Sequence, residues 1–327
     1  MYSTINNITY NKYHSLQYSK YINRYSYKNI HYSKIYCKSS SKEITYTTVK
    51  WFGWSILYNI YNKEAVLYID SSLVTAAQIL ISTGISTLYI NNSSTNVTYL
   101  SQIIDKKKYI VYFILVSIGQ WYGNYFGNLA TSIMTISSVN IIKSSEPIIS
   151  MIIMYIFFKT PQKLQKVCLI FPIIIGIMLC NTNNLSYSHY GTMLCILSNI
   201  FHTIKVIALK KYFSDILEYK GQQLIILSTV GSFLISLPIL LNNITILCSL
   251  SKQTVIYLVV SSIGYHYNSI AAFNIITKIS PVTFSLLNIY KRIVIILSSY
   301  IYNLEIPTLL ITSGILLSNI SLYFYLK

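Results

Sequence analysis

Two adjacent cations, Lys291 and Arg292, lie within a long run of isoleucine, valine and leucine, in the stretch NIYKRIVIIL of residues 288–297. A basic side chain at the middle of a membrane helix costs about 2.5–3.5 kcal/mol on insertion scales. Such residues usually face the interior of a helix bundle and mark the path of a substrate or an ion. Two lysines in other apolar segments, Lys143 and Lys205, belong to the same set.

These four cations call for a strong anionic partner. Glu146 is the only acid that we place well inside an apolar segment, and it lies one turn from Lys143, with which it can form a helical i,i+3 pair. One carboxylate cannot neutralise four cations, so the excess positive charge predicts a mobile anionic ligand. Phosphate suits it best, because an arginine fork bonds phosphate oxygens in a bidentate manner and lysine adds point charge.

Other interpretations of these residues stay open. Lys291 and Arg292 could snorkel to a membrane interface if their helix begins later, and we expect Lys205, near the basic end of its segment, to snorkel in this way. Pro147 could have no role beyond kinking a helix. However, a proline beside a charged residue also frees backbone groups that must line a cavity or be satisfied by neighbours. Trp51 is predicted to be an interfacial anchor.

The composition excludes several classes of protein. The 327 residues are 53% hydrophobic and 10% charged, whereas an ordinary soluble domain is about 25% charged. The net charge of +17 is accompanied by no zinc-finger, helix-turn-helix or RNA-binding signature, so we expect no nucleic-acid partner. The sequence contains no P-loop, GxGxxG, HExxH, GxSxG or CxxC motif, and we expect no enzyme activity, cofactor or metal. His202 and His266 are isolated and are expected to be packed polar residues.

Apolar segments close to the roughly 20 residues that cross a bilayer as a helix recur after a polar start. Residues 1–46 form a basic leader, either an organelle-targeting extension or a disordered tail. The transporter domain is predicted to follow at 47–327 as an all-α membrane protein. Its ten predicted transmembrane helices are 47–62, 72–91, 109–129, 131–158, 166–182, 189–209, 222–241, 254–277, 281–302 and 307–326.

The loop charges support this count. Cytoplasmic-like loops carry excess lysine and arginine, and an even number of spans puts both termini on one side. The predicted loops on the side of the N-terminus contain Lys106, Lys107, Lys108, Lys159, Lys163, Lys166, Lys210, Lys211, Lys220, Lys278 and Lys327. The opposite loops contain Lys63 and Lys252. Two five-helix repeats, at about 47–182 and 189–327, must then insert with inverted topology, as in many secondary transporters.

At these residues the chain resembles the plastidic phosphate translocators, the triose-phosphate and phosphoenolpyruvate translocator family of the drug/metabolite transporter superfamily. The matching segments are WFGWSILYNIYNK, VNIIKSSEPIIS, LSNIFHTIKVIALKK, YHYNSIAAFNIITKISP and SPVTFSLLNIYKRIVIILSS. The resemblance implies the ten-helix inverted-repeat fold of that superfamily and an exchange of inorganic phosphate for a phosphorylated C3, C5 or C6 compound. In that family a lysine of the fourth helix and a Lys-Arg pair of the ninth hold the phosphate, which assigns a phosphate clamp to Lys143, Lys291 and Arg292.

The rest of the family's pocket departs from its pattern here. A histidine and a threonine of the third helix and a tyrosine of the eighth complete that pocket, and the matching positions here are Asn124, Gly127 and Asn268. A neighbouring tyrosine, Tyr265 or Tyr267, could substitute for the missing one. The clamp is thus retained, whereas the part that reads the rest of the substrate differs.

We therefore expect an antiporter that exchanges phosphate for a phosphorylated C3 metabolite, namely triose phosphate, 3-phosphoglycerate or phosphoenolpyruvate. Its membrane is expected to be plastid-type, such as that of an apicoplast, and its state a monomer or a homodimer. The alternative is a nucleotide-sugar or other organic-anion carrier of the Golgi or endoplasmic reticulum. A membrane sensor that keeps a vestigial clamp is a third interpretation.

Overall fold

The structure is a computed structural model that describes residues 41–91, 107–158, 164–179, 188–209, 221–276, 278–279, 281–302 and parts of 309–321. These residues form helices, and no strand occurs among them. Residues 46–327 group into one compact unit. The predicted leader up to residue 40 and most loop lysines lie outside the described residues, so the leader and the charge asymmetry stay predictions.

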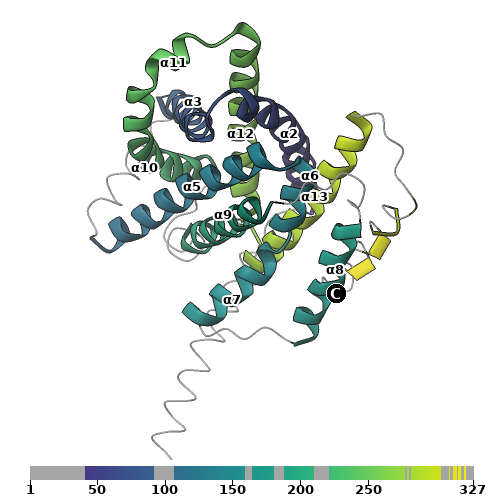
Figure 1. The fold of residues 1–327 in the computed structure, drawn as a ribbon. Coiled ribbons are helices and arrows are strands. Elements are labelled where there is room, and N and C mark those ends of the chain that lie inside the picture. Colours follow the sequence, from purple (N-terminus) through teal and green to yellow (C-terminus); the bar gives the residue numbers. More distant parts are fainter. Residues whose placement is uncertain are drawn as a thin grey trace, which may run out of the picture. The chain divides into compact units, whose positions relative to one another are not determined.

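The described helices follow one another along the chain (Figure 1). They are α2 (Ser41–Tyr68), α3 (Ser71–Asn91), α5 (Lys107–Ile133), α6 (Ile136–Lys143), α7 (Glu146–Phe158), α8 (Leu164–Leu179), α9 (His189–Ala208), α10 (Gly221–Asn242), α11 (Ile244–Cys248), α12 (Lys252–Ile276) and α13 (Pro281–Tyr302). Helix α2 begins before the predicted span, and the short α11 was not predicted. The tenth span lies largely outside the described residues, so the count of ten and the inverted repeats stay predictions.

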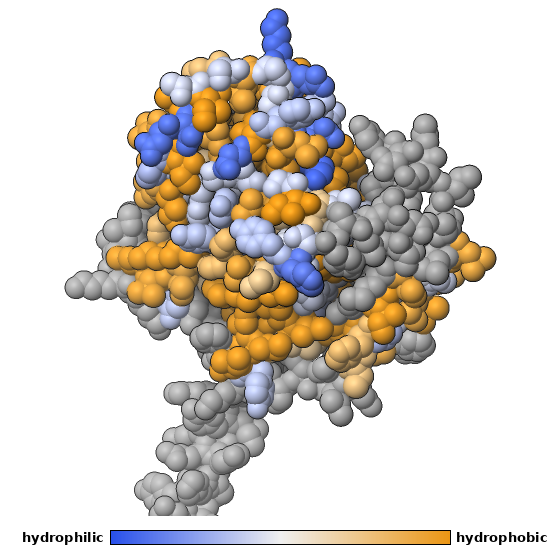
Figure 2. Space-filling model, in the orientation of Figure 1, coloured by the Kyte–Doolittle hydropathy of each residue, from blue (hydrophilic) through white to orange (hydrophobic). Residues whose placement is uncertain are grey.

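Four of the described helical segments are long and apolar enough to cross a bilayer: 71–88, 136–156, 189–208 and 225–242. Each carries large apolar side chains on its outer side, among them Leu88, Ile152, Met193 and Leu234, which are exposed. On the face shown in Figure 2, hydrophobic residues cover large areas of the surface. An apolar exterior of this kind is what a chain surrounded by lipid requires, so the protein is an all-helical membrane protein.

The predicted single helix at 131–158 is wrong, because it is interrupted in its middle. Helix α6 ends at Lys143 and α7 begins at Glu146, with a turn at the two serines between them. Pro147 explains the break, since it has no N–H to donate to the carbonyl of Lys143. The side-chain amide of Asn199 on α9 donates to that carbonyl at 3.2 Å. A neighbouring helix therefore satisfies the freed backbone group, as predicted.

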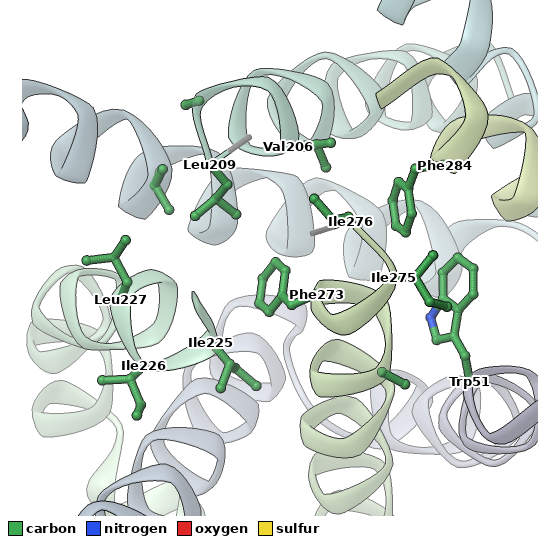
Figure 3. Packing of buried hydrophobic residues seen from close by; sticks show 13 residues of the cluster. Trp51, Val206, Leu209, Ile225, Ile226, Leu227, Phe273, Ile275, Ile276 and Phe284 are labelled. Atoms are coloured by element: carbon green, nitrogen blue, oxygen red, sulfur yellow. The ribbon is translucent and has the colours of Figure 1, made fainter. Parts of the chain in front are cut away.

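A hydrophobic cluster joins α2, α5, α9, α10, α12 and α13. Figure 3 shows Phe273 and Ile276 of α12 in its middle, with Trp51 of α2 and Phe284 of α13 near one end. The rings of Trp51 and Phe284 stack at 5.2 Å with an interplanar angle of 22°. This cluster fixes the N-terminal half of α13 against α2, and α13 carries the Lys-Arg pair.

Helices α5 and α9 pack closely along their length (Figure 1). The packing follows a GxxxGxxxG pattern in α5, made by Gly119, Gly123 and Gly127, a spacing that lets membrane helices approach at their backbones. A Cβ atom on Gly119 would lie 2.9 Å from the carbonyl oxygen of Phe201. One on Gly123 would lie 3.0 Å from the His202 ring.

We expect Gly231→Ala to destabilise the protein by roughly 1–3 kcal/mol, the usual cost of overpacking. A Cβ atom at this position of α10 would lie 2.7 Å from Cβ of Ser117 and 2.9 Å from the Phe113 ring. The measurement is the thermal unfolding midpoint in detergent. Gly84→Ala is the matched control, because a Cβ atom there meets no atom within 4 Å; an equal midpoint for the two variants would contradict the described packing of α10 on α5.

Candidate functional site

A cavity of about 160 Å³, lined by both polar and apolar side chains, lies among α2, α5, α6, α7, α9, α12 and α13. Its lining brings together the site residues predicted from the sequence, which are Asn124, Gly127, Lys143, Glu146, Lys205, Tyr265, Asn268, Lys291 and Arg292. They come from segments far apart in the chain, since Lys143 ends α6 and the Lys-Arg pair lies in the middle of α13. Their binding roles remain predictions, whereas their convergence on one cavity is a feature of the fold.

Arg292 is the most tightly held of the cations. Its Nη2 donates to Oε2 of Glu146 at 2.6 Å, and the side-chain amide of Asn288 donates to the same oxygen at 2.6 Å. Glu146 therefore pairs with Arg292 of α13, and the predicted i,i+3 pair with Lys143 is wrong. The break between α6 and α7 removes the helical spacing on which that pair depended.

The Arg292 guanidinium also has capacity left for a ligand. The side chain is 7% exposed, and its Nη1 has no hydrogen-bond partner among the described residues. A buried donor without a hydrogen-bond partner costs free energy. An anion whose oxygen accepts a hydrogen bond from Nη1 would remove this cost. Oδ1 of Asn288 is likewise without a partner among the residues that the structure describes.

Lys291 rests on an aromatic face. Its Nζ lies 4.4 Å from the centroid of the Trp51 ring, in a cation–π arrangement. Trp51 is only 1% exposed, so the prediction that it is an interfacial anchor is wrong. Its place in the core follows from the stack on Phe284, which needs the indole inside the bundle.

Lys143 occupies the space that Gly127 leaves. A Cβ atom on Gly127 would lie 2.6 Å from Nζ of Lys143 and 3.2 Å from Oγ of Ser198. The glycine thus has a defined role, because a larger residue at this position of α5 would displace the ammonium group. The lysine is the last residue of α6, so the break before Glu146 also decides where its side chain begins.

Lys205 does not snorkel, contrary to the prediction. It is 9% exposed, and its Nζ donates to Oε1 of Gln120 at 2.8 Å and lies 3.3 Å from Nδ1 of His202. The close approach of α9 to the glycines of α5 points this side chain inward. His202 lines the same cavity, while the other isolated histidine, His266, is bonded to Ser82 as a packed polar residue.

Tyr265 is the tyrosine that reaches the cavity. It is 3% exposed, and its hydroxyl accepts hydrogen bonds from Gln120 and, at 2.8 Å, from Asn124. Tyr267 instead is 41% exposed and stacks on Trp54 at 4.8 Å. Of the two tyrosines considered from the sequence, Tyr265 lines the cavity and Tyr267 does not.

Asn268 lies elsewhere on the cavity wall. Its Oδ1 accepts a hydrogen bond from Oγ of Ser55 at 2.5 Å, and Ser55 also donates to the Trp51 carbonyl at 2.7 Å. Two of the three positions that depart from the resemblance, Asn124 and Asn268, are therefore tied into hydrogen bonds that cross between helices. They are fixed polar groups, which suits recognition of a ligand.

Sequence reasoning did not select many residues of the cavity wall, among them Trp51, Gln120, His202 and Asn288. The signal for two of them was present. Gln120 directly follows the first glycine of the GxxxGxxxG pattern, and Asn288 precedes Arg292 by one helical turn. The position of Trp51 had no local signal, because its burial depends on the distant Phe284.

The charges of the described cavity wall are unequal, with Lys143, Lys205, Lys291 and Arg292 opposing one carboxylate, Glu146. Glu146 forms an ion pair with Arg292. Among the described residues, none of the three lysines has a carboxylate within ion-pair distance. No cluster of histidine, cysteine and acids that could hold a metal occurs in the described part of the chain. The arrangement is chemically suited to binding an anion with several oxygen atoms.

The chain is similar in sequence and in fold to known proteins. The model of the Triose-phosphate Transporter family matches residues 42–323. A putative transporter of Schizosaccharomyces pombe is 25% identical over 67% of this chain and 51% of its own, so the chain spans about half the length of that relative. Phosphoenolpyruvate/phosphate translocator 2, chloroplastic, of Arabidopsis thaliana is 24% identical over 77% of this chain and 68% of its own. One protein of known crystal structure shares the fold, with a TM-score of 0.62 and 9% identity over 86% of this chain and 96% of that one.

Proposed function

Because the chain belongs to the triose-phosphate transporter family, we propose that it exchanges inorganic phosphate for a phosphorylated C3 metabolite by alternating access across an organelle membrane. Curated relatives whose names state a substrate are phosphate translocators of chloroplasts, for phosphoenolpyruvate, triose phosphate, glucose 6-phosphate or xylulose 5-phosphate. The membrane we propose is therefore plastid-type. Triose phosphate, 3-phosphoglycerate and phosphoenolpyruvate are the candidate substrates.

The observation that carries the proposal is the convergence of three cations from α6 and α13 on one cavity. Lys143, Lys291 and Arg292 all line it, and Nη1 of Arg292 is unpartnered among the described residues. A phosphoryl group presents enough oxygen atoms to bond the arginine and both ammonium groups together. We name these three residues the phosphate clamp.

The same charges suggest why transport would be an exchange. Closing an empty cavity on both sides would bury Lys143 and Lys291 without a carboxylate, at a cost of several kcal/mol for each ion. Arg292 is less affected, because Glu146 remains beside it. A bound phosphate removes the cost for the lysines, so the loaded carrier closes and changes its orientation, whereas the empty carrier does not.

The test uses the full chain reconstituted into liposomes that contain phosphate. Labelled phosphate should enter these vesicles, and its entry into vesicles without internal phosphate should be much slower. Equal uptake in both would overturn the exchange mechanism, and no uptake in either would overturn the transport function. Uptake of a labelled nucleoside monophosphate into liposomes that contain the same compound, with no uptake of phosphate, would instead indicate a nucleotide-sugar carrier of the Golgi or endoplasmic reticulum.

We expect Gly127→Ala to raise the half-saturation concentration for phosphate by about tenfold. The added methyl group would lie 2.6 Å from Nζ of Lys143, so the ammonium must leave its position in the clamp, and one charge-assisted hydrogen bond is worth roughly 1.5–3 kcal/mol. The measurement is phosphate exchange against external concentration. Gly53→Ala is the control, since a Cβ atom there meets no atom within 4 Å. Identical half-saturation concentrations for both variants would show that Lys143 is not part of the clamp.

A further inference from the structure

We propose that Lys205, supported by His202, forms a second anion position in the cavity, one that binds the carboxylate of the transported metabolite. This inference rests on the proposed function, because it concerns the end of the substrate that the phosphate clamp does not hold. It assigns a preference for phosphorylated acids over phosphorylated sugars. A phosphorylated hydroxy acid or enol acid carries such a carboxylate, whereas triose phosphate carries a carbonyl group.

The first step is the lack of charge compensation at Lys205. Its polar partners are neutral groups, the amide oxygen of Gln120 at 2.8 Å and the ring nitrogen of His202 at 3.3 Å. An aromatic ring, that of Phe273, lies 5.7 Å from the ammonium. No carboxylate lies within ion-pair distance among the described residues, although the lysine is only 9% exposed. Buried charges in proteins are ordinarily paired, so the missing partner is an anion from outside the chain.

The second step is that the ammonium is held in the cavity and cannot swing to the membrane surface. The carbonyl of Phe201, one helical turn before Lys205, sits against Gly119, where an added Cβ would come within 2.9 Å. The Cβ atom of Lys205 itself lies 3.0 Å from the same hypothetical atom. The base of the side chain is therefore packed against the backbone of α5, and its end is bonded to Gln120.

The third step is the polar group around this position. Gln120 donates to the hydroxyl of Tyr265 and accepts from Lys205, so one side chain connects the two. Asn124 donates to the same hydroxyl at 2.8 Å. These fixed amide and hydroxyl groups keep the ammonium oriented, a form of preorganisation that reduces the entropy cost of binding.

The fourth step is that the two cationic positions come from different helices. The phosphate clamp comes from α6 and α13, whereas Lys205 and His202 come from α9, and all of them line one cavity. Glu146 does not serve Lys205 as a counter-ion at hydrogen-bond distance, because its Oε2 accepts from Arg292 and Asn288. A ligand with an anionic group at each end compensates both positions, which a single phosphate ion does only for the clamp.

The experiment compares Lys205→Gln with the native chain in phosphate-loaded liposomes, using external phosphate, phosphoenolpyruvate and dihydroxyacetone phosphate. In the native chain we expect phosphoenolpyruvate to compete better than dihydroxyacetone phosphate. In Lys205→Gln the transport of phosphoenolpyruvate relative to phosphate should fall about tenfold or more, the loss of a charge-assisted bond. The transport of dihydroxyacetone phosphate relative to phosphate should change by less than about threefold.

Two further variants make the result specific. Lys205→Arg keeps the charge and should restore part of the preference for phosphoenolpyruvate, while Lys252→Gln removes an exposed lysine at the start of α12 and should change no ratio. A native chain that exchanges phosphate but prefers dihydroxyacetone phosphate would overturn the inference and leave the proposed function standing. Equal losses for all three substrates in Lys205→Gln would overturn it too, since they indicate a purely structural lysine. A native chain that exchanges no phosphate would refute the proposed function itself.

Discussion

Replacing Arg292 with methionine is expected to reduce phosphate exchange by about 30-fold or more. Truncating one partner of a buried, hydrogen-bonded charge pair costs roughly 2–5 kcal/mol in binding, and tenfold corresponds to about 1.4 kcal/mol. The guanidinium is the group of the clamp that offers phosphate a planar fork of donors. The measurement is the initial rate of labelled phosphate uptake into phosphate-loaded liposomes.

The same substitution should also destabilise the fold. Glu146 would lose the 2.6 Å ion pair that compensates its charge, and removing one partner of a buried pair costs about 3–5 kcal/mol. A low rate alone would then not distinguish lost binding from lost protein. The thermal unfolding midpoint of the purified variant must be measured beside the transport rate.

A double variant separates the two effects. Combining Arg292→Met with Glu146→Gln removes both charges, and replacing a buried ion pair by neutral groups is often nearly neutral for stability. We expect the double variant to recover most of the native unfolding midpoint and to remain without exchange. Recovery of exchange together with stability would show that Arg292 acts only as a structural residue, and would exclude it from the phosphate clamp.

Much of the helical arrangement could be predicted from the sequence, because apolar segments of bilayer length are a strong signal. The described parts of the predicted spans from 47–62 to 281–302 are helical, except at residues 134–135 and 144–145 within the span 131–158. The interruption at Ser144 and Ser145 was missed as a boundary, although Pro147 indicated that backbone groups must be satisfied there. The lengths of α2 and α11 depend on where polar ends stop being helical, which hydropathy does not determine.

The candidate site was predictable as a set of residues and much less as a set of contacts. A charged side chain inside a membrane costs free energy. The positions of the four cations in apolar segments were therefore enough to select them: Lys143, Lys205, Lys291 and Arg292. Their partners could not be found in this way, because Glu146 reaches Arg292 across 146 positions of the chain. The inward direction of Lys205 depended on the packing of α9 against the glycines of α5. The tertiary fold decides such pairings, which a linear spacing rule does not describe.

Glu146 is positioned to compete with the substrate for Arg292. Its Oε2 accepts from Nη2 of Arg292 and from Asn288, each at 2.6 Å, which leaves Nη1 of the arginine free of partners among the described residues. A phosphoryl group therefore either bonds Nη1 alone or displaces the carboxylate and takes the whole fork. In the second case Glu146 returns to Arg292 when phosphate leaves, and so lowers the free energy of the emptied site.

Glu146→Gln is therefore expected to tighten phosphate binding and to slow exchange. A neutral amide holds Arg292 less strongly than a carboxylate, because it carries no negative charge to attract the guanidinium, so the half-saturation concentration should fall about tenfold. The maximal rate should fall by a similar factor, because release of phosphate would leave Arg292 without a counter-ion. Concentration-dependent exchange in liposomes measures both constants, and the unfolding midpoint confirms that the variant is folded. A rise in the half-saturation concentration of a folded variant would mean that Glu146 orients Arg292 for phosphate instead of competing with it, and the carboxylate would then belong to the clamp.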